Sequence, residues 1–217
     1  MGCLKKITNM IIFAALIFAF FAYGGYTFVK NKYDAYTKPE RNILVEEEKD
    51  FGNLSDVSAD YVLSRSLNLF GYRKLNALYV PKNQKITILD LNGSDVINEN
   101  DFEEGNIEEK LENFSSKIIN SPVIPVQNIE IKETGRIKAG SEFVPYADFE
   151  AEVKMAPIFK VKGTIAVYAT KNNNFISKIK NKVQNKEDIT SKLILAVRLF
   201  AEYDDKPVKK LISEIGL

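Results

Sequence analysis

The sequence contains no histidine and no tryptophan, and its one cysteine, Cys3, lies near the start of the chain. Ser-His-Asp and Cys-His catalysis both require an imidazole base, and catalytic zinc and haem usually take histidine or cysteine ligands. A single cysteine also cannot form a disulfide within the chain. These chemistries are therefore excluded for residues 30–217, which are left with carboxylates, lysine, serine, threonine and tyrosine as reactive groups.

Glycine-rich phosphate loops are also missing, because neither the G-x-G-x-x-G nor the G-x-x-x-x-G-K-[ST] pattern occurs. Neither sign of charge is in excess: 30 Lys and Arg face 29 Asp and Glu, which gives a formal net charge of +1. A nucleic-acid-binding domain usually carries a net positive charge or a dense basic face. We therefore expect no nucleic-acid partner, and no residue is assigned to cofactor binding.

What the sequence does contain is one long hydrophobic run, residues 10–29, without a single charge. Lys5 and Lys6 precede it, and Lys30 and Lys32 follow it. A helix of this length covers the hydrocarbon core of a bilayer, which is about 30 Å thick. The run predicts a transmembrane helix, and the lipid bilayer is the first expected partner of the chain.

Three ways of processing this N-terminus compete. A cleaved signal peptide would be cut near Gly24, but the apolar run continues to residue 29, which favours an uncleaved signal anchor. Gly2 and Cys3 resemble an acylation site, although Lys6 stands where that pattern requires Ser or Thr. A basic start followed at once by an apolar run is typical of export signals. We therefore expect a single-pass protein of the cell envelope whose C-terminal domain lies outside the cytoplasm, even though the lysines after the run do not support this orientation.

The domain organisation follows from this run. Residues 1–9 are a basic n-region and residues 10–29 the signal anchor. Residues 30–53 read as a flexible polar stalk, because they contain Pro39 and a run of charges at positions 46–50. Residues 54–217 are then the extracytoplasmic domain, which is long enough to bury a core of its own.

The first half of this domain shows both helical and strand patterns. Ser55 can cap a helix over residues 56–70. Residues 74–80 and 85–91 predict a pair of strands joined by a turn. Residues 106–120 carry apolar side chains on one helical face, which predicts a second helix.

The second half shows the clearest strand patterns. Apolar and polar residues alternate over residues 129–132, 148–155 and 159–168, which is typical of an antiparallel sheet with one face on the core. Ala156 and Pro157 separate the last two segments and predict a hairpin. Its register should place oppositely charged residues across from each other, as the pairs Glu152–Lys160 and Glu150–Lys162.

The C-terminal segment 189–203 fits a helix and a strand almost equally well, and its good helix formers favour a helix. Pro207 predicts the start of a short last helix. The whole is an α+β fold in which an antiparallel sheet of hairpins carries amphipathic helices on one face.

No catalytic, cofactor-binding or metal-binding residue is assigned. Ser177 and Lys180 match the Ser-x-x-Lys spacing, but the partner motifs of that enzyme class are missing. Residues 90–104 are rich in carboxylates, yet they lack the ordered ladder of a calcium loop. A basic run over residues 171–186 either faces water or steers the domain toward an anionic surface.

Three functions remain open. The first is a non-catalytic, membrane-anchored binding domain with a protein partner. The second is a carrier of lipid or another apolar ligand, for which fourteen Phe and ten Tyr could line a pocket. The third and weakest is a hydrolase of envelope polymers that uses a pair of carboxylates.

Overall fold

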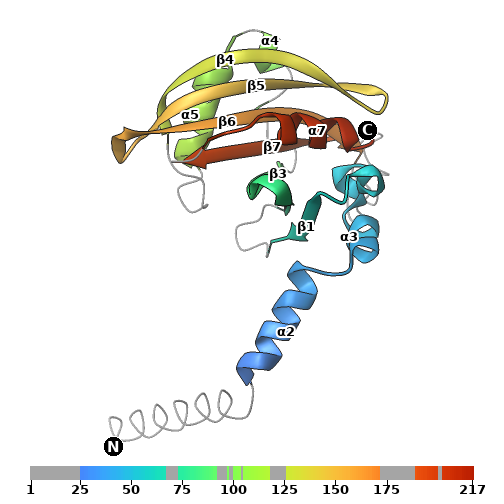
Figure 1. The fold of residues 1–217 in the computed structure, drawn as a ribbon. Helices are drawn as coiled ribbons and strands as arrows, with labels where there is room; N and C mark the ends of the chain where they lie inside the picture. The colour runs from blue at the N-terminus through green and yellow to red at the C-terminus, as the bar shows by residue number, and fades with distance from the viewer. Residues whose placement is uncertain are drawn as a thin grey trace, which may run out of the picture. The chain divides into compact units, whose positions relative to one another are not determined.

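The computed structural model describes residues 25–66, 73–91, 97, 100–103, 105–117, 126–171, 189–199 and 202–217. The chain divides into two compact units, Met1–Pro39 and Glu40–Leu217. The described element of the first unit is the helix α2, Gly25–Thr37 (Figure 1). Within the described residues, no helix is both long and apolar enough to cross a membrane. Most of the expected span, residues 10–24, lies outside the described residues, so the span stays a prediction.

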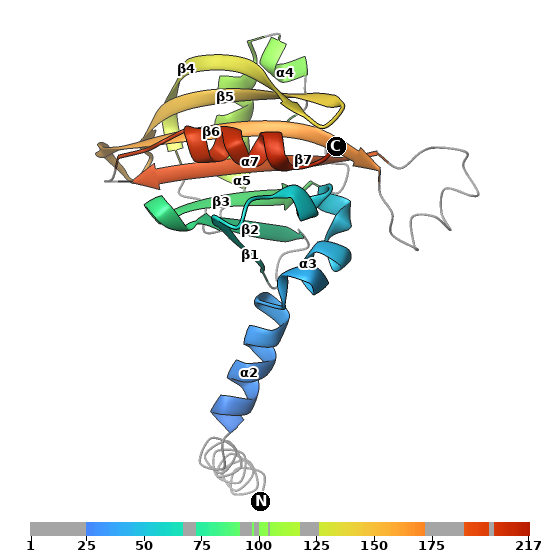
Figure 2. The ribbon, with the colours of Figure 1, turned by 45° about the vertical axis from the view of Figure 1, so that its right-hand side comes forward.

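The second unit is built on one antiparallel sheet of seven strands, in the order β1-β2-β3-β7-β6-β5-β4 (Figure 2). Hairpins connect β1 to β3 and β4 to β6, and β7 returns to pair with both β3 and β6. The strands are β1 Tyr61–Arg65, β2 Lys74–Tyr79, β3 Gln84–Asp90, β4 Val126–Ala139, β5 Glu142–Val153, β6 Ala156–Lys171 and β7 Ile189–Leu199.

Helices cover both faces of this sheet. On one face lie α3 (Arg41–Glu47), the 3₁₀ turns η1 (Lys49–Phe51) and η2 (Leu54–Asp56), and α7 (Lys206–Glu214). On the other face α5 (Ile107–Lys117) packs, next to the short helix α4 (Asn100–Glu103) (Figures 1 and 2). A further 3₁₀ turn, η3 (Val80–Lys82), joins β2 to β3.

The expectation of helices on one face only was therefore wrong. The reason lies in the central strands β6 and β7, whose successive residues are buried on alternate faces. Ala166 and Ile194 belong to the core under α7, whereas Ile165 and Leu193 belong to the core under α5. A strand that is apolar on both faces needs a cover on both.

Two further expectations for secondary structure were wrong. The predicted helix 56–70 is replaced by η2 and the strand β1, in which Tyr61 and Leu63 are buried and Val62 between them is exposed. The segment 189–203 forms the strand β7 over Ile189–Leu199. Strand β3 pairs with one edge of β7 and β6 pairs with the other. This pairing outweighs the modest helix propensity of the β7 residues.

Other expectations were confirmed. The strand pair β2–β3, the helix α5 and the last helix α7 form where the patterns placed them. The β5–β6 hairpin has the expected register, with Glu152 opposite Lys160 and Glu150 opposite Lys162.

Part of the expected stalk, residues 30–53, is packed instead of flexible. Leu44 on α3 and Phe51 on η1 are fully buried in the core under α7. Tyr168 donates a hydrogen bond to the Phe51 carbonyl oxygen at 2.7 Å, and Thr170 donates one to the Asp50 carbonyl oxygen at 2.9 Å. Residues from Glu40 onward therefore belong to the folded unit.

Candidate functional site

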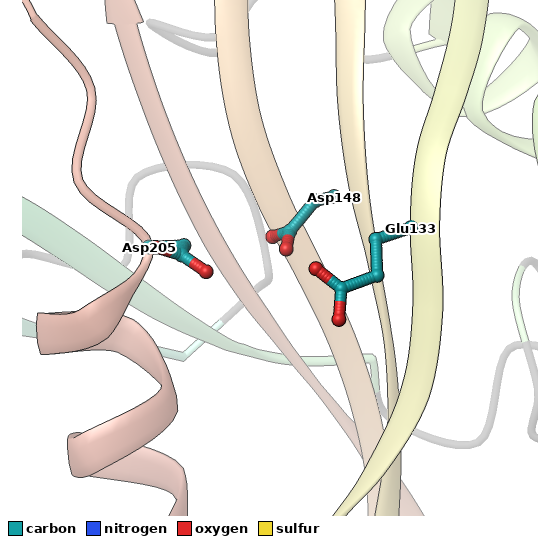
Figure 3. Close-up of side chains that lie close together, drawn as sticks. All are labelled: Glu133, Asp148 and Asp205. Carbon is teal, nitrogen blue, oxygen red and sulfur yellow. The ribbon is translucent and has the colours of Figure 1, made fainter.

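Three carboxylates converge where the N-terminal end of α7 meets the sheet. They belong to Glu133 on β4, Asp148 on β5 and Asp205 just before α7, and one oxygen of each lies within 4.8 Å of the others (Figure 3). Glu133 and Asp148 are partners across the β4–β5 ladder, which brings them to the same point of the sheet. Asp205 arrives from the other side, as the N-cap residue of a helix that Pro207 helps to start.

The ammonium group of Lys209 binds all three carboxylates. Its Nζ atom lies 2.6 Å from Asp205, 2.8 Å from Asp148 and 3.3 Å from Glu133. Lys209 follows Asp205 by four residues, so one turn of α7 places the two side chains together. Burial opposes the charged form, but the hydrogen bonds to Asp148 and Asp205 outweigh it and raise the pKa of Lys209. We call these four residues the Lys209 cluster.

Three hydroxyl groups form hydrogen bonds at the edge of the Lys209 cluster. Tyr146 donates a hydrogen bond to Glu133 at 2.8 Å, and its ring lies 4.4 Å beneath the Lys209 ammonium. Thr164 donates to Asp148, and Tyr203 donates to Thr164. The bonds from Tyr146 and Lys209 lower the pKa of Glu133.

An open pocket of about 340 Å³ lies against this cluster. Lys132, Glu150, Lys162 and Tyr203 line it together with the three carboxylates of the cluster, so its wall contains charges of both signs. Phe149 and Gly163 supply the apolar part of the lining. An open pocket with charged groups in its wall is a poor match for a fatty acyl chain.

The chemistry of the Lys209 cluster is limited by its central ammonium group. Carboxylate oxygens are good ligands for hard divalent cations, but the Lys209 ammonium already lies among these three oxygens. The general acid of a carboxylate hydrolase has a raised pKa, and Glu133 does not suit that role because its pKa is lowered. The arrangement is suited to holding α7 on the sheet.

Sequence reasoning missed this cluster. The spacing of Asp205 and Lys209 is a signal for a contact along one helix, but it does not indicate what else the lysine binds. Glu133 and Asp148 lie on strands whose pairing joins them only in the folded sheet.

A second charged group lies inside the protein. Asp90 on β3 and Lys192 on β7 form an ion pair at 2.8 Å, and both residues are buried. The Lys192 ammonium also lies 5.2 Å from the centre of the Phe51 ring. Burial lowers the pKa of Lys192, against the opposing effect of Asp90. Asp90 is therefore not available to a calcium ion, and Asp101 from the same acidic stretch is paired with Lys110 at 3.7 Å.

Other sites considered from the sequence lie outside the described residues. These are Ser177 and Lys180, most of the basic run 171–186, and residues 92–96, 98, 99 and 104 of the acidic stretch. The expectations for them remain predictions.

The tip of the β5–β6 hairpin, residues 154–160, is the most exposed apolar feature of the described sheet. Met155 in the turn is 88% exposed, and Ile158 is 84% exposed. Val153 pairs with Ala156, but Glu152 pairs with Lys160, so residues 157–159 have no partners on β5 and bulge outward. Lys154 and Lys160 border the apolar side chains, and both are exposed. We call these residues the hairpin tip.

No known protein family matches this chain, and no curated protein matches it significantly in sequence.

Proposed function

We propose that residues 40–217 form a non-catalytic binding domain that works at the outer side of a membrane, with residues 10–29 as its anchor. The alternatives from the sequence, a carrier of lipid or another apolar ligand and a carboxylate-based hydrolase of envelope polymers, are outcomes that the experiment below distinguishes.

One observation carries the proposal: large apolar side chains are gathered at the exposed end of a hairpin whose sheet is otherwise well packed. The central part of the sheet is covered on both faces by the two apolar cores, in which residues such as Leu75, Ile165 and Leu193 are fully buried. Met155 and Ile158 at the hairpin tip stay in water. Exposed apolar groups that are gathered in one place usually mark an interaction surface.

Two further observations support an anchored, non-catalytic domain. The exposed tyrosines Tyr26, Tyr33 and Tyr36 on α2 lie at and just beyond the end of the expected span, where aromatic side chains are enriched at membrane interfaces. Histidine is absent from the whole chain, and the carboxylates of the Lys209 cluster are bound to an ammonium group.

The experiment uses the full chain with a C-terminal tag, expressed in a bacterial host. We expect the tagged protein to stay with the membrane fraction after an alkaline wash, and to be digested by protease added to spheroplasts. A variant without residues 10–29 is the control and should be recovered in a soluble fraction. Recovery of the intact, unprocessed chain from soluble cytosol would contradict the proposal.

Native mass spectrometry of the protein extracted from these membranes distinguishes the three functions. A bound protein, or no tightly held molecule, agrees with a surface-binding domain. A lipid retained in fixed stoichiometry after delipidation favours the carrier. Release of sugars or peptides from purified envelope polymers, lost in Asp148→Asn, favours the hydrolase.

A further inference from the structure

We propose that the hairpin tip is a second membrane contact, which inserts Met155 and Ile158 between anionic lipid headgroups while Lys154 and Lys160 bind those headgroups. This inference deepens the proposed function and rests on it, because it assumes that the domain is held beside a bilayer.

The backbone of the tip directs the apolar side chains away from the sheet. Lys154 and Met155 form a tight turn between the partners Val153 and Ala156. The bulge that follows pushes Ile158 out of the ladder, so it cannot pack against β5. The tip therefore projects from the end of the sheet opposite to the β4–β5 hairpin (Figure 1).

The charges of the tip match an anionic surface. Between Val153 and Val161 the sequence contains two lysines and no acidic residue. Lys154 and Lys160 form no salt bridge with any residue that the structure describes. The acidic residues behind the tip contact other groups: Glu130 contacts Lys132, Glu150 contacts Lys132 and Lys162, and Glu152 contacts Asn128. Glu152 also lies opposite Lys160 in the β5–β6 register.

This pattern of two apolar side chains between two lysines is that of an interfacial membrane contact. Lysine next to an anionic leaflet contributes favourably, and its long stem lets the apolar neighbours sink below the charged group. A second copy of the tip would be a poor occupant, because a symmetric contact would bring lysines against lysines. A single hairpin binds a bilayer weakly, but an anchor in the same chain raises the effective concentration of the surface.

The test places an environment-sensitive fluorophore on the tip of the full chain. Cys3→Ser removes the native thiol, and Met155→Cys provides a unique site for a bimane label. Phe143→Cys is the matched control, since Phe143 is 57% exposed and lies at the opposite end of β5. Both proteins are reconstituted into phosphatidylcholine vesicles with and without phosphatidylglycerol, and thermal unfolding confirms that the labelled variants are folded.

We expect the label at position 155 to shift to the blue and to be quenched by doxyl lipids when phosphatidylglycerol is present, and the label at position 143 to change little. Each of Lys154→Gln and Lys160→Gln should lower the ratio of docked to undocked tip by about fivefold. Ile158→Ser should lower it by about tenfold or more. Added salt should reduce the effect of the two lysine substitutions on this ratio but leave the effect of Ile158→Ser unchanged.

Equal signals at positions 155 and 143, or a signal at 155 that ignores phosphatidylglycerol and the two lysines, would overturn the lipid contact. A shift seen only in native membranes and absent from pure lipid vesicles would also overturn it, in favour of a protein partner. In all these outcomes the chain is integrated into the vesicles. A chain that does not integrate at all contradicts the proposed function instead.

Discussion

Replacement of Lys209 by methionine tests the role assigned to the Lys209 cluster. The change keeps most of the side-chain volume but leaves the carboxylates of Asp148 and Asp205 without the ammonium that lies 2.8 and 2.6 Å away. The side chain of Lys209 is 22% exposed, so the free energy of its ion pairs should lie between that of an exposed pair and that of a buried pair. Exposed pairs contribute about 0–1 kcal/mol, and breaking a buried one costs about 3–5 kcal/mol.

We therefore expect Lys209→Met to lower the free energy of unfolding by about 2–3 kcal/mol, since two close charge-assisted bonds are lost. For a domain of this size, that corresponds to a fall in Tm of about 4–12 °C. Thermal unfolding of the full chain, followed by circular dichroism, measures both quantities.

The matched control is Lys210→Met, at the next position of α7. Lys210 is 42% exposed and pairs with Asp60 at 2.9 Å and Glu214 at 3.7 Å, so its loss should lower the Tm clearly less than the loss of Lys209 does. In a double variant, Asp148→Asn should restore part of the stability lost in Lys209→Met, because it removes one of the crowded negative charges. Equal stabilities of the two lysine variants, or no rescue by Asp148→Asn, would refute the reasoning.

Three other perturbations test the rest of the fold. Asp90→Ala removes the carboxylate that lies 2.8 Å from the buried ammonium of Lys192 and should cost about 3–5 kcal/mol in denaturant unfolding; a cost below about 1 kcal/mol would contradict the buried ion pair. Gly163→Ala should cost about 1–3 kcal/mol in the same assay, because the new Cβ would lie 2.8 Å from the Phe149 ring and 2.5 Å from a backbone oxygen; an unchanged midpoint would show that this contact relaxes freely. The lowered pKa of Glu133 stabilises the folded state above the unfolded pKa of about 4.3, and this stability should be lost as the pH falls through the lower folded pKa; Glu133→Gln should flatten that acid limb of a pH titration of Tm.

The strands β5 and β6 could be predicted in register from the sequence. Their alternation has a period of two, and a shift by one residue would have turned the apolar face of one strand to water and set Glu150 or Glu152 opposite Val161 instead of a lysine. The helices α5 and α7 could also be predicted, since each has one apolar stripe next to a start or stop signal.

Prediction from the sequence was wrong where contacts with other segments of the chain decide the structure. The segment 189–203 fits either a helix or a strand locally, and the two strands beside β7 select the strand over Ile189–Leu199. Leu44 and Phe51 stand among charged residues, which conceals that both are fully buried in the core. The Lys209 cluster joins residues that are as many as 76 positions apart, Glu133 and Lys209, and no local pattern encodes that contact.

By itself, the sequence determined which reactive side chains residues 30–217 lack, the expected membrane segment at residues 10–29, and the alternation of the β5–β6 hairpin. These depend on residue types and on short-range periodicity, which a linear chain already carries. Only the tertiary structure decided that β7 is a central strand, that the Lys209 ammonium lies among three carboxylates, and that Met155 and Ile158 stay outside the core. Each of these depends on contacts between distant segments, whose free energy exists only once the chain has folded.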